Sequence, residues 1–401
     1  MRMPRIATCA LVAAVATGFG VTAAFGAGSA AAPIKLGAVL SLTGPGSSLG
    51  IEEDHALVLK VAQFNAAGGL KGHKVSLKIV DDQSTPDVAV QATRTLIADF
   101  KPDAIIGGSI SATCLAMRPV TEAAQVLQYC LSAAPITYPA PYYFSAQSPF
   151  TRWIGDVPIY WMVQKGIKSV GCLYTTDSSG QLTNQVVQKA ATQAGLKYAS
   201  QSFAGTDTDV TTQLTKLRGA GIDALYICTT GAGVVTALNG VRQLGMSIPI
   251  WISSGSASLP IASLIKGILP SQGAYTAGAK IQVVRKLPKT DRQRKLILAF
   301  SKAYEKRFKE PADIFSATGA DVFNILTRTI ANVGPGKPAG SYTSYMEDKI
   351  RLTGVQLNYN FTPNDHRGTD LDGIVNRFNS SGAFDFVADY APGKIPRYAE
   401  K

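Results

Sequence analysis

Histidine, cysteine and recognisable catalytic motifs are scarce in this sequence of 401 residues, which contains 3 His and 5 Cys. The histidines, His55, His73 and His366, lack the spacing of a metal site or a catalytic triad, and no C-x-x-C pair points to zinc or thiol redox chemistry. We expect His55 on an exposed helix face and the other two histidines in turns. Neither a G-x-S-x-G nucleophile elbow nor a G-x-x-x-x-G-K-[ST] phosphate loop occurs. These absences predict a protein that is not an enzyme and that needs neither a cofactor nor a metal.

One glycine-rich segment partly matches the fingerprint of dinucleotide-binding enzymes. Gly44, Gly46 and Gly50 follow an expected strand and open an expected helix, and Asp81 ends the next strand. The third glycine is one position too late for G-x-G-x-x-G, and the acid lies too far along the chain. An exported Rossmann-type enzyme is therefore the least favoured interpretation of this sequence.

Charged residues are absent from Ile6 to Ile34, and Arg2 and Arg5 precede this stretch. The stretch is rich in Ala, Val and Gly, and small residues cluster towards its end. This arrangement predicts a cleaved secretory signal peptide over residues 1–32, with cleavage between Ala27 and Ala32. A membrane anchor is the alternative, but so much Gly and Ala makes a poor membrane span.

No later stretch is long and apolar enough to cross a bilayer, so we expect a soluble mature protein in the periplasm. Its length of about 370 residues exceeds one comfortable core and predicts two lobes. The formal net charge of the whole chain is +12, which favours mild attraction of anionic solutes. The basic residues are scattered apart from one cluster at Arg285–Arg294, and export removes nucleic acid as a partner. We therefore expect that the protein binds no nucleic acid. We also expect a monomer.

Four cysteines remain in the predicted mature chain: Cys114, Cys130, Cys172 and Cys228. Export permits disulfides, and a Cys114–Cys130 bond is conceivable because both residues are expected near one edge of the same sheet. Buried free thiols are nevertheless the state that we expect for these cysteines. Whether Cys172 pairs with Cys228 stays open.

Expected strands and helices alternate along the chain after the signal peptide. In the first helix, Leu57, Val61 and Phe64 recur at i, i+4 and i+7, and Gly68-Gly69 is suited to end that helix. Strands that are separated by helices predict a parallel, doubly wound sheet. The expected strands of this first half are Ile34–Leu40, Val75–Asp81, Ala104–Ile106 and Val126–Leu131.

The alternation restarts after Pro135–Pro149, a segment dense in Pro, Ser and Tyr that we interpret as a connection. Two such units in series predict two similar Rossmann-like lobes. The C-terminal part then adds helices at Asp291–Phe308, Ala317–Ala331 and Tyr342–Leu352. The expected strands of the second half are Val170–Tyr174, Tyr198–Phe203, Ala224–Cys228 and Ile248–Ile252, followed by Gln356–Phe361, Gly373–Phe378 and Phe384–Ala388.

Small polar residues dominate the segments that follow the strands in both halves. Ligands of open parallel sheets bind at the carboxyl ends of the strands, where hydroxyls and helix N-termini favour an anion. Gly, Ser and Thr are also common there as caps and turns. The indication of a binding site therefore depends on both halves presenting such segments.

Several segments together resemble the type I periplasmic substrate-binding proteins of ABC importers, in particular the branched-chain amino acid (Leu/Ile/Val) receptor family. The resemblance spans essentially the whole mature chain. It implies an α/β fold of two Rossmann-like lobes joined by a three-segment hinge, with lobe 1 at 33–147 plus 279–353 and lobe 2 at 148–278 plus 354–401. The segments that carry it are Ile34–Pro45, Asn65–Gly72, Val80–Asp82, Ile106–Gly108 and Asp365–Gly368.

The resemblance also implies a set of ligand-binding positions. In the first lobe, a hydroxyl after the third strand and backbone N–H groups after the fourth hold the carboxylate of the ligand in this family, and Ala134 stands where a hydroxyl residue is often found. In the second lobe, the family's amino-acid binders place an acid for the α-ammonium where this chain has Ser254. Carried over, the positions are Leu49, Ser111, Ser132, Ala133, Ala134, Ser179, Thr230 and Ser254.

The departures from the family pattern change the expected solute. Leu49, Ser179 and Thr230 stand where the family has aromatic residues, and Ser254 stands where it has an acid. Asp177 is the candidate substitute for that acid, but it lies a turn away. A buried ammonium without an anionic partner is costly, so an aromatic or keto carboxylate is favoured over a branched-chain amino acid. Candidate apolar walls, which also suit core or hinge packing, are Tyr142, Tyr143, Phe150, Trp153 and Trp251.

The sequence thus predicts a receptor that captures a solute and closes around it. Solute contacts to both lobes would stabilise the closed form, which the permease subunits of the importer would recognise. The alternative is a ligand-binding sensor that reports to a separate signalling protein.

Overall fold

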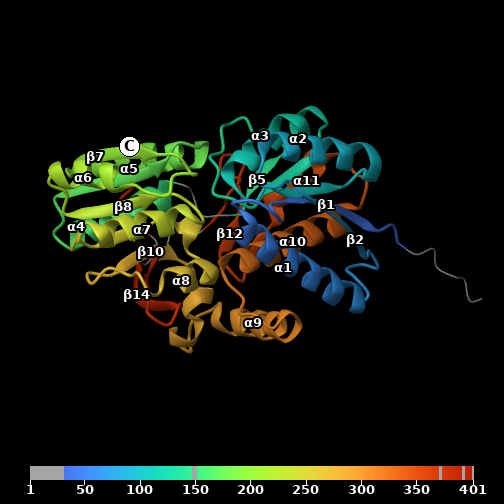
Figure 1. The fold of residues 1–401 in the computed structure, drawn as a ribbon. Helices are drawn as coiled ribbons and strands as arrows, with labels where there is room; N and C mark the ends of the chain where they lie inside the picture. Colours follow the sequence, from blue (N-terminus) through green and yellow to red (C-terminus); the bar gives the residue numbers. More distant parts are fainter. Residues whose placement is uncertain (1–30, 147–150, 370–372, 391–392, 400–401) are drawn as a thin grey trace, which may run out of the picture. The chain divides into compact units, whose positions relative to one another are not determined.

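The computed structural model describes residues 31–146, 151–369, 373–390 and 393–399. The predicted signal peptide lies outside these residues except for its last two positions. Within residues 31–401 the strands form one sheet of five strands, one of seven and a short pair (Figure 1). No helix in the described part of the chain is long and apolar enough to cross a membrane.

The five-stranded sheet has the order β2-β1-β3-β4-β5, and every pairing in it is parallel. Its first strand alternates between two apolar layers: Val39 packs in one cluster and Leu40 in the other. Helices therefore cover both faces of this sheet, as a parallel sheet requires. The strands are β1 (Ile34–Leu40), β2 (Val75–Asp81), β3 (Ala104–Gly107), β4 (Leu127–Cys130) and β5 (Tyr143–Ser145).

Strand β5 corrects the interpretation of Pro135–Pro149 as a mere connection. Tyr143 and Phe144 are fully buried, and β5 pairs in parallel with β4 at the sheet edge. Three extended residues between prolines are too few to show a period of two, which is why the sequence did not indicate this strand.

Four of the helices that contact this sheet come from residues 47–123 and 314–333, and local sequence signals mark an end of two of them. Helix α1 ends before Gly68 and Gly69, whose φ angles of 89° and 80° suit glycine, as predicted. Helix α10 begins at the cap Asp313, whose side chain accepts the N–H of Ile314. The helices are α1 (Ser47–Ala66), α2 (Pro86–Thr95), α3 (Ser111–Ala123) and α10 (Ile314–Val333).

The seven-stranded sheet has the order β14-β13-β10-β9-β8-β6-β7. Its first five strands in the chain are parallel, and the C-terminal β13 and β14 join as antiparallel strands beside β10. The second lobe therefore has the predicted parallel sheet, which the two antiparallel C-terminal strands extend at one edge, and β10 was not predicted. The strands are β6 (Ser169–Thr175), β7 (Lys197–Phe203), β8 (Ala224–Cys228), β9 (Ile250–Ile252), β10 (Ala274–Gly278), β13 (Gly373–Phe378) and β14 (Phe384–Tyr390).

The remaining elements connect the two sheets or cover them. The predicted strand at Gln356–Phe361 is present over three residues as β12, and the helix predicted to reach Leu352 ends at Lys349 because β11 begins there. The helices are α4 (Val157–Gln164), α5 (Ser178–Gln193), α6 (Thr211–Gly219), α7 (Gly233–Gln243), α8 (Leu259–Ile265), α9 (Arg294–Phe308) and α11 (Ala339–Lys349). The short turns of helix are η1 (Leu96–Phe100), η2 (Thr151–Asp156), η3 (Ser254–Ser256) and η4 (Lys280–Lys286), and the paired strands are β11 (Arg351–Thr353) and β12 (Asn358–Asn360).

Both cysteine pairs are disulfides, so the expectation of free thiols is wrong. Cys114 bonds to Cys130 with the Cα atoms 5.7 Å apart, and Cys172 bonds to Cys228 with the Cα atoms 6.3 Å apart. The second bond joins the neighbouring strands β6 and β8. The register pairs Cys172 with Tyr226 and Tyr174 with Cys228, so the two cysteines are diagonal neighbours. Only this register brings together two cysteines that are 56 positions apart in the sequence.

His55 is less exposed than predicted, and His366, which was expected in a turn, is buried. His55 is half-buried, with its Nδ1 atom 2.6 Å from Glu310 Oε1 and its ring stacked on Phe308. His366 lies in a bend but is buried, and its Nε2 atom is 2.8 Å from Glu347 Oε1. Both rings thus have structural partners and no metal-binding geometry.

Candidate functional site

A cavity of about 60 Å³ lies where segments from the carboxyl ends of both sheets converge. Ser111 is the first residue of α3, and Ser132 follows β4 in the five-stranded sheet. From the seven-stranded sheet, Ser179 lies in the first turn of α5, Thr230 follows β8 and Ser254 follows β9. This is the location at which open parallel sheets bind their ligands.

Seven of the eight predicted positions line this cavity. Five supply hydroxyls, two from the five-stranded sheet and three from the seven-stranded sheet, and Leu49 supplies part of an apolar wall. Both sheets contribute, as a closing receptor requires. The seven are Leu49, Ser111, Ser132, Ala133, Ser179, Thr230 and Ser254.

Ala134 is the exception, because it is fully buried behind the cavity wall. Its N–H donates to Ser132 Oγ at 3.2 Å, and its carbonyl oxygen accepts from the Arg367 guanidinium. The N–H expected to reach the ligand is therefore already used. Ala134 supports the Ser132 hydroxyl and does not form part of the wall.

Sequence reasoning did not single out seven further lining residues. Ser109, Ile110, Ser253 and Gly255 belong to segments that follow strands, where a solute was expected to bind, and Thr183 lies one turn after Ser179. Ile154 and Phe315 come from η2 and from the start of α10, and no local pattern marks them. The seven residues are Ser109, Ile110, Ile154, Thr183, Ser253, Gly255 and Phe315.

None of the described aromatic candidates for an apolar wall lines this cavity, and most of them take the alternative role of core packing. Trp251 and Tyr143 are fully buried in the core, and Trp153 lines a separate, smaller cavity. Tyr142 packs against the main core, and Phe150 lies outside the described residues. The apolar side chains that do line the cavity are Leu49, Ile110, Ile154 and Phe315.

The cavity wall carries no charged side chain among the residues that the structure describes. Asp177, which lies two residues before the lining residue Ser179, instead caps α5 by accepting the N–H of Gly180 at 2.9 Å. The first turns of α3 and α5 reach the wall at Ser111 and Ser179, and unpaired N–H groups at helix N-termini favour an anion. The electrostatic character of the site is thus neutral side chains with positive helix ends.

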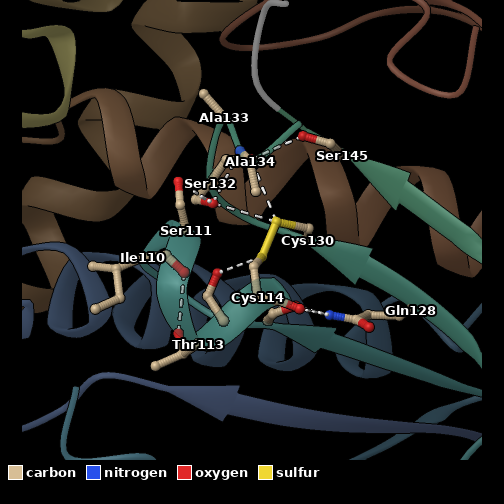
Figure 2. The surroundings of a disulfide bond; sticks show 12 residues. Ile110, Ser111, Thr113, Cys114, Gln128, Cys130, Ser132, Ala133, Ala134 and Ser145 are labelled. Atoms are coloured by element: carbon tan, nitrogen blue, oxygen red, sulfur yellow. Dashed lines mark hydrogen bonds between the residues drawn. A yellow bond between two sulfur atoms is a disulfide. The ribbon is translucent and has the colours of Figure 1, made fainter. Parts of the chain in front are cut away.

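The hydroxyls of Ser111 and Ser132 lie 3.3 Å apart at one side of the cavity. Ser132 Oγ accepts the N–H of Ala134, so its own proton is left for Ser111 or for a ligand. The Ser145 hydroxyl donates a hydrogen bond to the carbonyl oxygen of Ser132 at 2.8 Å. The same hydroxyl accepts a hydrogen bond from Arg367 Nη1 at 2.9 Å. Figure 2 shows Ser111, Ser132 and Ser145 around the end of β4.

The segment Asp365–Gly368 holds the buried Arg367 in place. Asp365 Oδ1 accepts the N–H groups of Arg367 and Gly368, both at 3.0 Å. Burial lowers the pKa of the Arg367 guanidinium. The guanidinium donates hydrogen bonds to Ser145 and Ala134, which replace bonds that it would make to water. This segment therefore supports the cavity wall from behind.

Two buried carboxyl groups lie behind the other side of the wall. Asp82 Oδ1 accepts the Ser41 hydroxyl at 2.7 Å, and the N–H of Ser41 donates to Ser109 Oγ at 3.0 Å. Burial raises the pKa of Asp82 and raises the pKa of Glu53 to about 8. Glu53 thus holds its proton at neutral pH, which keeps negative charge away from the cavity. The described residues contain no cluster of His, Cys, Asp or Glu suited to a metal ion.

Comparison with known proteins finds a family model that covers most of the chain. The family model described as Periplasmic binding protein matches residues 33–380. The Leu/Ile/Val-binding protein homolog 7 of Brucella abortus (strain 2308) is 28% identical over 213 residues, which cover 50% of this chain and 53% of that protein. The chain spans about half the length of this curated relative.

Two solved structures show the same fold over nearly the whole length. An extracellular ligand-binding receptor from Rhodopseudomonas palustris HaA2 superposes with a TM-score of 0.80 at 23% identity, covering 88% of this chain and 99% of that one. A solute-binding protein of an ABC transporter from R. palustris, in complex with benzoate, superposes with a TM-score of 0.76 at 18% identity, covering 90% and 97%. Identities this low establish the fold alone.

Proposed function

The chain belongs to the periplasmic binding protein family, and from this premise we propose that it is the solute receptor of an ABC importer and that its solute is a small organic acid without an ammonium group. The acid would bind in the cavity between the two sheets. The protein would act in the periplasm as a monomer and would deliver its solute to permease subunits at the membrane.

The absence of charge from the described cavity wall is the observation that carries the choice of solute. An α-ammonium group enclosed there would have no anionic partner, and leaving a buried charge unpaired costs several kcal/mol or more. A carboxylate would accept hydrogen bonds from Ser111 and Ser132 and would lie near the N-termini of α3 and α5. These contacts favour an acid over an amino acid such as leucine.

The cavity volume supports a small acid as the first member of this class. At about 60 Å³ the cavity is smaller than the apolar cavities of roughly 150 Å³ that admit benzene. A short 2-keto acid such as pyruvate suits this volume, whereas an aromatic acid requires the lobes to separate further. The benzoate complex of a structural neighbour supports the aromatic acid as the second member of the proposed class.

Closure of the two lobes would couple binding to transport. We place the hinge at the three crossings between 33–147 plus 279–353 and 148–278 plus 354–401. A solute that contacts Ser111 on one side and Ser254 on the other would stabilise the closed form by as much as its affinity for that form exceeds its affinity for the open form.

A thermal-shift comparison of pyruvate, benzoate, leucine and acetamide tests the proposal. An acid present at 100 times its dissociation constant should stabilise the protein by roughly 2.7 kcal/mol. We expect pyruvate or benzoate to raise the melting temperature and leucine to leave it unchanged. A larger shift with leucine than with either acid would refute the proposed solute class, and turnover of any of the four compounds would refute the receptor.

A further inference from the structure

The first turn of α3 and the end of β4 meet at the cavity through a disulfide. Cys114 lies three residues after Ser111, and Cys130 lies two residues before Ser132. Figure 2 shows the sulfur–sulfur bond running from the first turn of α3 to the end of β4, beside the two serines. Both cysteines are fully buried, so the bond forms part of the support behind the wall.

The disulfide also contacts one of the two cavity hydroxyls directly. Cys130 Sγ lies 3.4 Å from Ser132 Oγ, which lies 3.3 Å from Ser111 Oγ. On the other side, Cys114 Sγ lies 3.3 Å from the carbonyl oxygen of Gly108, in the segment that leads from β3 into α3. The bond thus touches both of the segments that carry the two hydroxyls.

Little apolar packing could replace this bond. The two cysteines belong to a small cluster with Ala134, Ala140 and Tyr143, separate from the main core. The Cys172–Cys228 bond, by contrast, lies inside the main core and joins two strands that are already paired by backbone hydrogen bonds. Removing the first bond should therefore loosen a contact between a helix and a strand, whereas removing the second should leave its strands in register.

We propose that the Cys114–Cys130 disulfide positions the Ser111 and Ser132 hydroxyls so that both reach one acidic group of the solute. Cys114 and Cys130 are thus positioning residues, and Ser111 and Ser132 are the groups that touch the solute. The contact with an acid rests on the proposed function, but the positioning of the two segments does not. A hydrogen bond to a charged group gives roughly tenfold in affinity, so loss of this alignment should weaken binding at least about tenfold.

The other contacts of α3 should keep a variant without this bond folded. Gln128 Nε2 donates to the carbonyl oxygens of Gly107 and Cys114, at 3.0 and 3.1 Å, and Gln128 Oε1 accepts the Thr121 hydroxyl at 2.9 Å. These bonds join α3 to β3 and β4 further from the cavity. We therefore expect the change to be local to the wall.

The test compares C114A/C130A with the matched control C172A/C228A, because each removes one buried disulfide. The first readout is hydrogen exchange of residues 109–113 and 131–134, followed by mass spectrometry. The second is calorimetric titration with pyruvate and with benzoate. We expect both variants to melt at lower temperature, but only C114A/C130A to exchange at least about tenfold faster in these two segments and to lose at least about tenfold in affinity. The variant C114V/C130A fills the space of the sulfurs without linking them and should behave as C114A/C130A does.

Unchanged exchange in both segments, or equal changes in the control variant, would overturn the positioning role. If the wild-type protein binds neither acid, the proposed solute class fails, and the exchange measurement still decides the positioning role by itself. If exchange rises but the affinity for a bound acid is unchanged, the two hydroxyls do not hold that acid and the inference is wrong.

Discussion

The carboxylate of Asp321 accepts the backbone N–H of Val355 at 2.6 Å, which ties the middle of α10 to the segment between β11 and β12. The same carboxylate accepts the N–H groups of Gln356 and Leu357 at 2.9 and 3.3 Å. This segment leads towards the C-terminal strands that complete the seven-stranded sheet. One buried side chain thus satisfies three backbone donors at a crossing between the two sheets.

Replacing Asp321 with Ala should destabilise the protein by on the order of 3 kcal/mol, because three buried N–H groups would lose their acceptor. Urea denaturation followed by circular dichroism measures this change. D321N keeps one acceptor oxygen and should lose less. A loss below about 0.5 kcal/mol for D321A, the level of an ordinary surface change, would show that these hydrogen bonds contribute little.

The stability of the protein should fall as the pH rises from about 5 to about 8. Burial raises the pKa of Glu53 from the ordinary 4.5 to about 8 in the folded state. Between these values the folded state holds a proton that the unfolded state releases, so a higher pH favours unfolding. Asp313 and Asp321, whose pKa values burial raises to about 6, add the same trend below pH 6.

Substituting Glu53 with Gln should remove much of this trend, because a neutral amide titrates no proton. Melting temperatures from pH 5 to pH 8.5 should vary less for E53Q than for the wild type. The exposed Glu305 provides the control, since E305Q should keep the wild-type slope. A wild-type melting temperature that rises over this range would contradict the protonated state of buried Glu53.

Removing the Ser111 hydroxyl should weaken the binding of pyruvate about tenfold, because one hydrogen bond to a carboxylate is lost. Calorimetric titration of S111A measures this change. Ser247 is exposed and lies outside the cavity, so S247A should bind as the wild type does. Where the wild type binds pyruvate, equal affinities of S111A and the wild type would remove Ser111 from the site.

Adding a methyl group at Gly180 should disturb the start of α5 at the cavity. A Cβ atom there would lie 2.1 Å from the backbone oxygen of Thr175, too close for any rotamer to relieve. We expect G180A to lower the melting temperature by several degrees, which corresponds to roughly 1–3 kcal/mol. Gly205 has open space around its Cβ position, so G205A should differ little from the wild type. Equal melting temperatures for the two variants would show that the chain moves aside at Gly180 at no cost.

Local apolar patterns were sufficient for elements whose own residues carry the signal. The strand Ile34–Leu40 is a largely apolar run buried on both faces, and the helix around Leu57 and Phe64 repeats apolar residues at helical spacing, so both are present as predicted. The segment Tyr143–Ser145 has no such pattern, and it is a strand only because β4 offers an unpaired edge to it. Short segments are decided by their partners, which periodicity does not reveal.

The cavity residues also divide into those that the order of elements predicts and those that only tertiary contacts decide. Ser132 and Ser254 follow strands, and the carboxyl ends of parallel strands share one edge of a sheet, so their convergence follows from the order of the elements. Phe315 reaches the same cavity from the start of α10, a position that depends on how α10 packs against α1. Ala134 is one residue from the wall, yet its N–H is taken by Ser132, which only the coordinates of both groups reveal.

The sequence by itself therefore determined the alternation of strands and helices, the two-lobed α/β class and the loops from which hydroxyls reach the cavity, because these depend on local spacing and chain order. The tertiary structure decided which cysteines pair, which apolar side chains close the cavity and where the buried carboxyl groups lie. These features depend on contacts between residues far apart in the chain, and such contacts exist only once strand register and helix packing are set.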